Sequence, residues 1–192
     1  MKKVLISTLV LGSLVAATAQ DASVNAFGNA YVIDPSVKVR AGSFEIGDNS
    51  AGMYGVSFGG NRIFKYFTAG VDIILSGSNI KESTQSEPLY GMEGVFRAGY
   101  NFNQSGKGLG VFGTWGAYLG MYSTEEPSIN GGTRSSTSTL MGSGFGAEVE
   151  YVFDNGFSLG ARHQSYKLTA DKVGIDPEFD ATITEGYLGY HW

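Results

Sequence analysis

The end of the chain alternates strictly between two kinds of side chain. One parity is apolar and carries Leu188, Tyr190 and Trp192. The other parity is more polar or smaller and carries Glu185, Tyr187, Gly189 and His191. A period of two is typical of a β-strand whose two faces meet different surroundings. We therefore expect the chain to finish in an amphipathic strand that ends on an aromatic residue.

The same alternation divides the chain into eight segments of strand length, separated by turn-forming residues. They are residues 37–47, 53–61, 66–77, 89–102, 108–122, 138–153, 157–168 and 181–192. Tight turns follow the second, fourth and sixth segments, and long polar stretches follow the third, fifth and seventh. The first connection, residues 48–52, is short and is the exception. Transmembrane β-barrels sort short turns and long loops to opposite ends in this way, whereas a soluble β-sandwich has no reason to do so.

Charged residues occupy the polar parity of these segments. They are Lys38, Arg40, Glu45, Asp72, Glu93, Arg97, Glu148, Glu150, Arg162 and Glu185. If the apolar parity faces lipid, these side chains face a narrow lumen, where a lone charge would cost several kcal/mol. We therefore predict an internal ion-pair network, with His191 as a further member at one mouth. In the first segment the apolar phase shifts between Ala41 and Phe44, which predicts a bulge near Gly42 and Ser43.

Aromatic residues gather beside the tight turns and at the end of the chain. They are Phe58, Phe67, Tyr100, Phe102, Tyr151, Phe153, Phe157, Tyr190 and Trp192. Such a belt is typical of a girdle at a membrane interface. The alternative is a soluble, lipocalin-like periplasmic barrel, which would reverse the faces and place charges in water and aromatics in a ligand cavity.

The N-terminus predicts export from the cytoplasm. Lys2 and Lys3 precede an apolar run, and Ala17-Thr18-Ala19 forms a small-residue cleavage site, so residues 1–19 are interpreted as a secretory signal peptide. Residues 20–36 are interpreted as a periplasmic lead-in, because Asp34-Pro35-Ser36 is expected to interrupt a strand, and residues 37–192 as the barrel. Without Lys2 and Lys3 the chain has 13 − 2 = 11 basic and 18 acidic residues, a net charge of −7 that argues against nucleic acid as a partner. The chain has no Cys, which excludes disulfides and thiol chemistry.

The signal peptide, the eight alternating segments, the short turns and the Tyr190-His191-Trp192 terminus together resemble the small outer-membrane barrels of the OmpA/OmpX and opacity-porin type. The resemblance implies an all-β fold, an eight-stranded antiparallel transmembrane β-barrel with short periplasmic turns and longer extracellular loops. It also implies a monomer in the outer membrane of a Gram-negative cell, in contact with membrane lipid and lipopolysaccharide. The barrel-assembly machinery would recognise the C-terminal strand. Members of this group end mostly in Phe, so Trp192 departs from their pattern.

Candidate chemistry lies near the end of the chain. His163-Gln164-Ser165 is similar to the His-x-Ser of PagL-type lipid A deacylases, which would make Ser165 a nucleophile, His163 its base and Glu178 the nearest orienting acid. The Asn that follows the Ser in that family is Tyr166 here. Asp171, Asp176, Glu178 and Asp180 could offer oxygens to Ca²⁺, although no spaced loop signature is present.

Two functions follow from the barrel interpretation, and neither needs a cofactor or a metal. A structural or surface-interaction protein is favoured, because side chains can fill the interior of an eight-stranded barrel. A narrow, porin-like channel for small solutes is the main alternative. It would use charged residues of the lumen as its gate.

Overall fold

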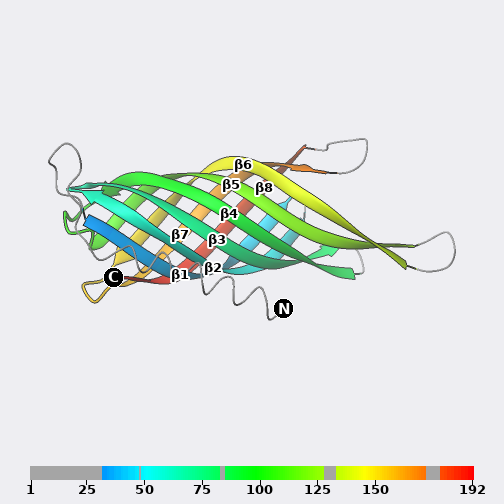
Figure 1. Cartoon of the computed structure of the whole chain (residues 1–192), viewed down its shortest axis with the longest axis horizontal. Helices are drawn as coiled ribbons and strands as arrows, with labels where there is room; N and C mark the ends of the chain where they lie inside the picture. The colour runs from blue at the N-terminus through cyan, green and yellow to red at the C-terminus, as the bar shows by residue number, and fades with distance from the viewer. Residues whose placement is uncertain (1–31, 48, 83–84, 128–132, 172–177) are drawn as a thin grey trace.

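A computed structural model describes residues 32–47, 49–82, 85–127, 133–171 and 178–192 of the chain. These residues form eight antiparallel strands that close into one barrel, so the predicted fold class is confirmed (Figure 1). The strands are β1 (Val32–Ile46), β2 (Asn49–Phe64), β3 (Phe67–Glu82), β4 (Gln85–Asn101), β5 (Gly108–Pro127), β6 (Thr133–Val152), β7 (Phe157–Ala170) and β8 (Glu178–His191). Within the described ranges no helix is long and apolar enough to cross a membrane. The predicted signal peptide and residues 20–31 lie outside these ranges.

Each strand pairs with its neighbours in the sequence, and β1 also pairs with β8. The connections between β2 and β3, β4 and β5, and β6 and β7 are tight and lie at one end of the barrel, which we call the turn end. The opposite end is called the loop end. At the last tight turn, Gly156 has φ of 87°, a left-handed conformation that Gly adopts without strain. The end of β8 lies at the turn end too, since the His191 N–H donates to the Gly156 carbonyl.

Strand β1 begins at Val32, so residues 32–36 belong to the barrel and not to the lead-in that the sequence pattern assigns. Both neighbours hold this stretch in place. Ser36 pairs with Gly59 on β2 and with His191 on β8. Pro35 has no N–H to donate, but its carbonyl accepts a hydrogen bond from the Trp192 N–H at 3.2 Å. A Pro this close to the start of a strand is compatible with pairing.

The predicted bulge near Gly42 and Ser43 is wrong. The registers of β1 with β2 and with β8 run without a break through both residues. The apolar phase changes because Phe44 points into the lumen, where its ring stacks on Tyr118 at a centroid distance of 5.6 Å. Glu45 is therefore outward and exposed, and it is not a member of the lumen network.

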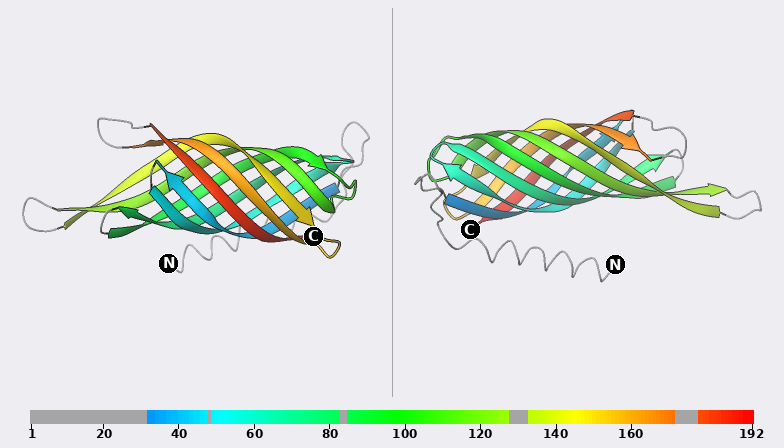
Figure 2. Two further views of the ribbon diagram at one scale, coloured as in Figure 1. Left: turned by 180° about the vertical axis from the view of Figure 1, so that it is seen from behind. Right: turned by 45° about the horizontal axis from the view of Figure 1, so that its top comes forward.

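The registers also fix the tilt of the strands. Starting at Ser36, the paired residues are Gly59, Asp72, Val95, Gly116, Gly144, Tyr166, Ala181 and then Ile46, back on β1. One path of paired residues around the barrel thus starts at residue 36 and returns to β1 at residue 46, a stagger of 46 − 36 = 10 residues. For eight strands this stagger corresponds to a tilt of about 40° from the barrel axis. The strands are visibly tilted in Figure 2.

Inward side chains change character along the barrel. On β1, Lys38 and Arg40 come first from the turn end and Phe44 follows; on β8, Glu185 lies nearer the turn end than Ile183. Near the loop end the inward residues form an apolar cluster, which we call the plug. Its buried members are Phe44, Met53, Leu89, Tyr118, Leu140, Tyr166, Leu168, Ala170, Ala181 and Ile183. The lumen thus contains a charged layer and, nearer the loop end, an apolar layer.

Candidate functional site

Nine of the ten charged residues predicted for the lumen lie inside it, and Glu45 is the exception. The nine are 0–2% exposed, so they are buried as deeply as the apolar core of a soluble protein. They come from six strands, because alternate residues of every tilted strand point inward and meet at the axis. Charges this deeply buried must be paired, since water does not compensate them.

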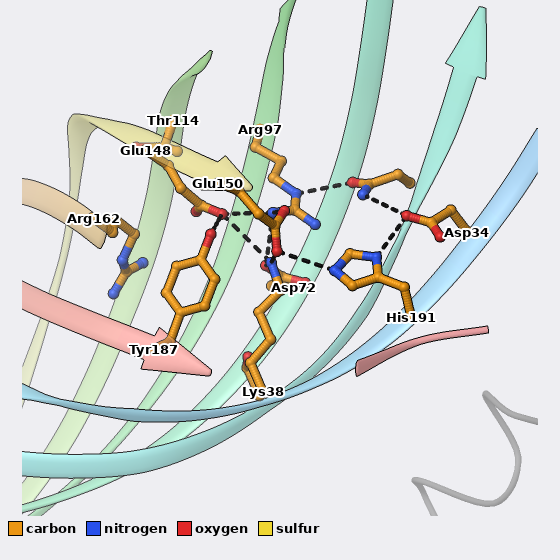
Figure 3. Close-up of polar contacts among 12 residues, drawn as sticks. Asp34, Lys38, Asp72, Arg97, Thr114, Glu148, Glu150, Arg162, Tyr187 and His191 are labelled. Carbon is orange, nitrogen blue, oxygen red and sulfur yellow. Dashed lines mark hydrogen bonds and ion pairs between the residues drawn. The ribbon is translucent and has the colours of Figure 1, made fainter. Parts of the chain in front are cut away.

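One half of the network gathers around two carboxylates of β6 (Figure 3). Lys38 Nζ lies 2.9 Å from Glu150 and 3.5 Å from Glu148. Arg97 Nη1 lies 2.5 Å from Glu148 and 3.0 Å from Glu150. The Tyr187 hydroxyl donates to Glu148 at 2.6 Å, and its ring lies 4.5 Å from Lys38 Nζ. Two cations and a hydroxyl therefore compensate two adjacent carboxylates.

The other half forms a chain of alternating charge. Arg162 Nη2 donates to Glu93 at 2.8 Å, while its Nε lies 2.8 Å from Glu185 without the alignment of a hydrogen bond. Arg40 lies 2.5 Å from Glu185 and 3.3 Å from Asp72. Asp72 is in turn 3.8 Å from both Lys38 and Arg97. The two halves are therefore one continuous network across the lumen.

His191 extends this network to the turn end. Its Nδ1 lies 2.7 Å from Asp34 and its Nε2 lies 3.0 Å from Glu150. The Asn61 side-chain amide also donates to Asp34 at 3.3 Å and accepts from Arg97 at 2.9 Å. The sequence pattern misses Asp34, because Pro35 beside it was expected to end the strand pattern.

Tyrosines join the network to the plug. The Tyr166 hydroxyl donates to Glu93 at 2.6 Å, and the Tyr166 ring packs on Tyr118 at 5.7 Å. Tyr166 attracts notice in the sequence only as a departure from the deacylase motif. Its inward parity on β7, shared with Arg162 and Gln164, is the signal that could have found it.

The plug and the network together fill the cross-section. Leu168 and Ile183 in the plug are 0% exposed, as are Glu93 and Arg97 below them. A continuous water path would leave part of these side chains exposed to it. Phe44 stacks on Tyr118, and Tyr118 packs against Tyr166 with the two rings tilted, so large rings occupy the space that an open pore would need.

Aromatic side chains surround the turn end on the outer wall. Eight of the nine predicted girdle residues lie in the first or last few residues of a strand at the turn end, or directly after such a strand. All eight are exposed. Neighbours pack as pairs: Tyr151 with Phe153 at 4.9 Å, and Phe157 with Tyr190 at 5.4 Å. Phe58 is outward as well, but it lies six residues before the end of β2 and pairs with Ile73, so it stands above the girdle.

The two faces are the reverse of those in a soluble ligand-binding barrel. The charges are inside and the aromatics outside, which contradicts the lipocalin-like alternative. Outward apolar residues such as Phe145, at 74% exposure, and Leu188, at 70%, would otherwise contact water. An apolar outer band is what a transmembrane barrel presents to lipid.

Comparisons with known proteins support the same fold. No family model and no curated protein matches the chain. Among solved structures, Ail, the attachment invasion locus protein of Yersinia pestis, is similar with a TM-score of 0.57 and 10% identity, covering 85% of this chain and 99% of Ail. Neisserial surface protein A is similar with a TM-score of 0.52 and 12% identity, covering 83% of this chain and 97% of that protein. The chain has the fold of the small outer-membrane β-barrels.

On the wall of this outer-membrane barrel fold, the residues of the predicted deacylase triad do not assemble. His163 and Ser165 are both outward and exposed on β7. His163 Nδ1 lies 2.9 Å from the Thr184 hydroxyl, so its partner is on β8 and is not Ser165. Glu178 pairs in register with Thr169, six residues beyond His163 along β7, and its carboxylate lies 3.3 Å from Lys167. No acid is therefore placed to orient His163 among the described residues.

The acidic residues considered for Ca²⁺ are divided between described and undescribed parts of the chain. Glu178 and Asp180 lie at the start of β8, where Lys167 is 3.3 Å and 4.0 Å from them. Asp171 follows β7, and Asp176 lies outside the described residues. Across the described ranges no three His, Asp or Glu side chains are placed to hold a metal ion.

Proposed function

We propose that the protein is an outer-membrane β-barrel with a closed lumen and a structural or surface-interaction role. The observation that carries the proposal is the filled cross-section: an ion-pair network buried under an apolar plug, inside a wall of exposed apolar side chains. In this proposal the turn end faces the periplasm and the loop end faces the outside, as in other transmembrane barrels. The charges hold the strands together and do not form a conducting gate.

The loop end offers the surface for interaction. Pairing between β4 and β5 ends at Leu89 and Tyr122, and pairing between β6 and β7 ends at Leu140 and Ala170. Residues 123–127 of β5 continue to pair with residues 133–137 of β6 alone. They form a two-stranded ribbon that projects past the rim of the barrel (Figure 1). Ail, which shares the fold, is named for attachment and invasion, and a ribbon that projects past the rim is placed to make such contacts.

Insertion is tested by moving a charge along the outer wall. Ile73 is outward and 45% exposed midway along β3. Ile73→Arg is expected to cost about 2–4 kcal/mol in lipid and to lower the yield of folded protein in vesicles. Ser123→Arg, past the apolar band, is the control and is expected to fold normally. Folding is read from a heat-modifiable gel band and a β-type circular dichroism spectrum.

Closure is tested by conductance. The refolded wild-type protein is expected to give no channel events in a planar bilayer, because the plug blocks the lumen. A soluble β protein that needs no amphiphile and tolerates Ile73→Arg would contradict the membrane proposal. Steady conductance by the folded wild type, changed in Arg97→Met, would contradict only the closed lumen.

A further inference from the structure

The outer apolar surface is much taller on one side of the barrel than on the other. On β5 the outward residues are apolar or Gly from Leu109 to Met121, whereas on β7 they are apolar only from Phe157 to Ala161. At about 3.3 Å per residue and a tilt of about 40°, these runs cover about 30 Å and about 10 Å of the barrel axis. Lipid normally meets an apolar band about 25 Å tall. The outward residues of β7 therefore offer no apolar surface in the half nearest the loop end, although Phe145 on β6 lies beside Ser165.

A contiguous polar patch occupies this place, and we call it the polar notch. It consists of His163, Ser165 and Lys167 on β7, Thr182 and Thr184 on β8, and Ser43 on β1. Thr184 pairs in register with both His163 and Ser43, and Thr182 pairs with Ser165, so the residues are direct neighbours. The three strands lie side by side on one wall (Figure 2).

The notch has unused hydrogen-bonding capacity. His163 and Thr184 bond to one another at 2.9 Å. The hydroxyls of Ser165 and Thr182 have no hydrogen-bond partner among the described residues, and both side chains are on the outer wall. A hydroxyl left without a partner in hydrocarbon costs free energy. The notch therefore fits a polar group better than it fits acyl chains.

Charge decides which polar group fits. Lys167 is the cation of the notch, and it is already 3.3 Å from Glu178 and 4.0 Å from Asp180. Glu45 is next to the notch as well, since it pairs with Thr182. Carboxylates thus outnumber cations here, so a phosphate would be repelled. An uncharged, hydroxyl-rich group can donate to and accept from the Ser, Thr and His side chains.

We propose that the polar notch binds the sugar headgroup of a glycolipid in the outer leaflet. The inference rests on the proposed function, because the loop end must face the outside for the notch to lie at the level of that leaflet. The sugar hydroxyls take the hydrogen bonds that hydrocarbon cannot give. The acyl chains of the same lipid lie against the shorter apolar wall toward the turn end.

The test measures which lipids the refolded protein retains. The protein is prepared with equal amounts of a neutral diglycosyl diacylglycerol, phosphatidylglycerol and phosphatidylcholine with the same acyl chains, and bound lipids are counted by native mass spectrometry. Preferential retention of the glycolipid is expected. Ser165→Ala combined with Thr182→Val is expected to weaken that preference about tenfold, the effect of about two hydrogen bonds. Ser123→Ala, an exposed hydroxyl on β5, is the matched control and should retain the preference.

Three results would overturn the proposal. Equal retention of the three lipids, or preference for phosphatidylglycerol, would mean that the notch has no affinity for sugars. Equal losses in the double variant and in Ser123→Ala would place the binding elsewhere. Because the chain has no native Cys, Ser165→Cys can report whether a second copy of the protein occupies the notch. A disulfide-linked dimer in vesicles, together with no preference for the glycolipid, would mean that the notch is a protein interface. The heat-modifiable band separates these results from a failure of the proposed function, in which no variant inserts.

Discussion

Arg97 is the residue whose loss should weaken the barrel most clearly. It is 0% exposed and lies 2.5 Å from Glu148, 3.0 Å from Glu150 and 3.8 Å from Asp72. Arg97→Met keeps most of the side-chain volume and removes the charge. Lys38 is then the one Lys or Arg side chain left in ion-pair contact with the two carboxylates of β6 among the described residues. Removing one partner of a buried ion pair typically costs about 3–5 kcal/mol, so we expect the free energy of unfolding to fall by about that amount.

The assay is reversible urea unfolding in lipid vesicles, followed by Trp fluorescence. A loss of 3 kcal/mol corresponds to about a hundredfold change in the folding equilibrium, which such curves resolve. Lys167→Met is the matched control, because its ammonium is exposed and its contacts with Glu178 and Asp180 are worth about 1 kcal/mol or less. Adding Glu148→Gln to Arg97→Met should recover part of the loss, since the uncompensated carboxylate is removed. Equal stability of Arg97→Met and Lys167→Met would refute the reasoning and indicate a hydrated network.

Three further variants test other parts of the interior. Phe44→Ala should destabilise the barrel by about 3–5 kcal/mol in the same urea assay, because it leaves a cavity in the plug; a loss below about 1 kcal/mol would mean that the plug is loosely packed. Gly144→Ala should prevent the heat-modifiable band, because a Cβ there would stand 1.8 Å from the Ser165 carbonyl oxygen. Gly94→Ala is the control and should fold normally, since a Cβ there would have no atom within 4 Å. Equal yields of the two folded variants would show that β6 and β7 can separate. His191→Leu should lower stability by about 1–3 kcal/mol, since Asp34 and Glu150 lose a hydrogen-bonding partner, and an unchanged urea midpoint would show that this contact is not needed.

Much of the fold can be predicted from alternation alone. Period-two patterns locate all eight strands, because each strand separates a lipid-like and a lumen-like surface. The strand ends are less visible. Apart from Pro127, residues 123–127 and 133–137 are all polar in the sequence, so their pairing as a ribbon leaves no alternating signal. Pro35 conceals the start of β1 for a different reason: local turn propensity is overridden by pairing with two neighbouring strands.

Parity also places nine charged residues in the lumen. It does not predict which cation pairs with which anion. Those partners come from different strands, such as Arg162 on β7 and Glu93 on β4, and depend on the stagger of the whole barrel. Glu45 shows the limit of parity. The pattern treats Phe44 as lipid-facing, which requires a bulge and turns Glu45 inward, whereas Phe44 in fact points into the lumen. The plug is missed for the same reason: Phe44 and Leu89 are apolar, and apolar residues in such a chain are expected to face lipid.

The seam between β1 and β8 has a consequence for the order of folding. Residues 36–46 pair with residues 181–191, and His191 contacts Asp34, which lies 157 positions away in the sequence. Every other strand pair can form as a local hairpin, but this one must wait until the whole chain is present. Closing so long a loop is slow, and until it happens two strand edges stay open to other chains. A chain that stops before the last strand would therefore keep its hairpins and lose its closure, so we expect it to aggregate and not to form a smaller barrel.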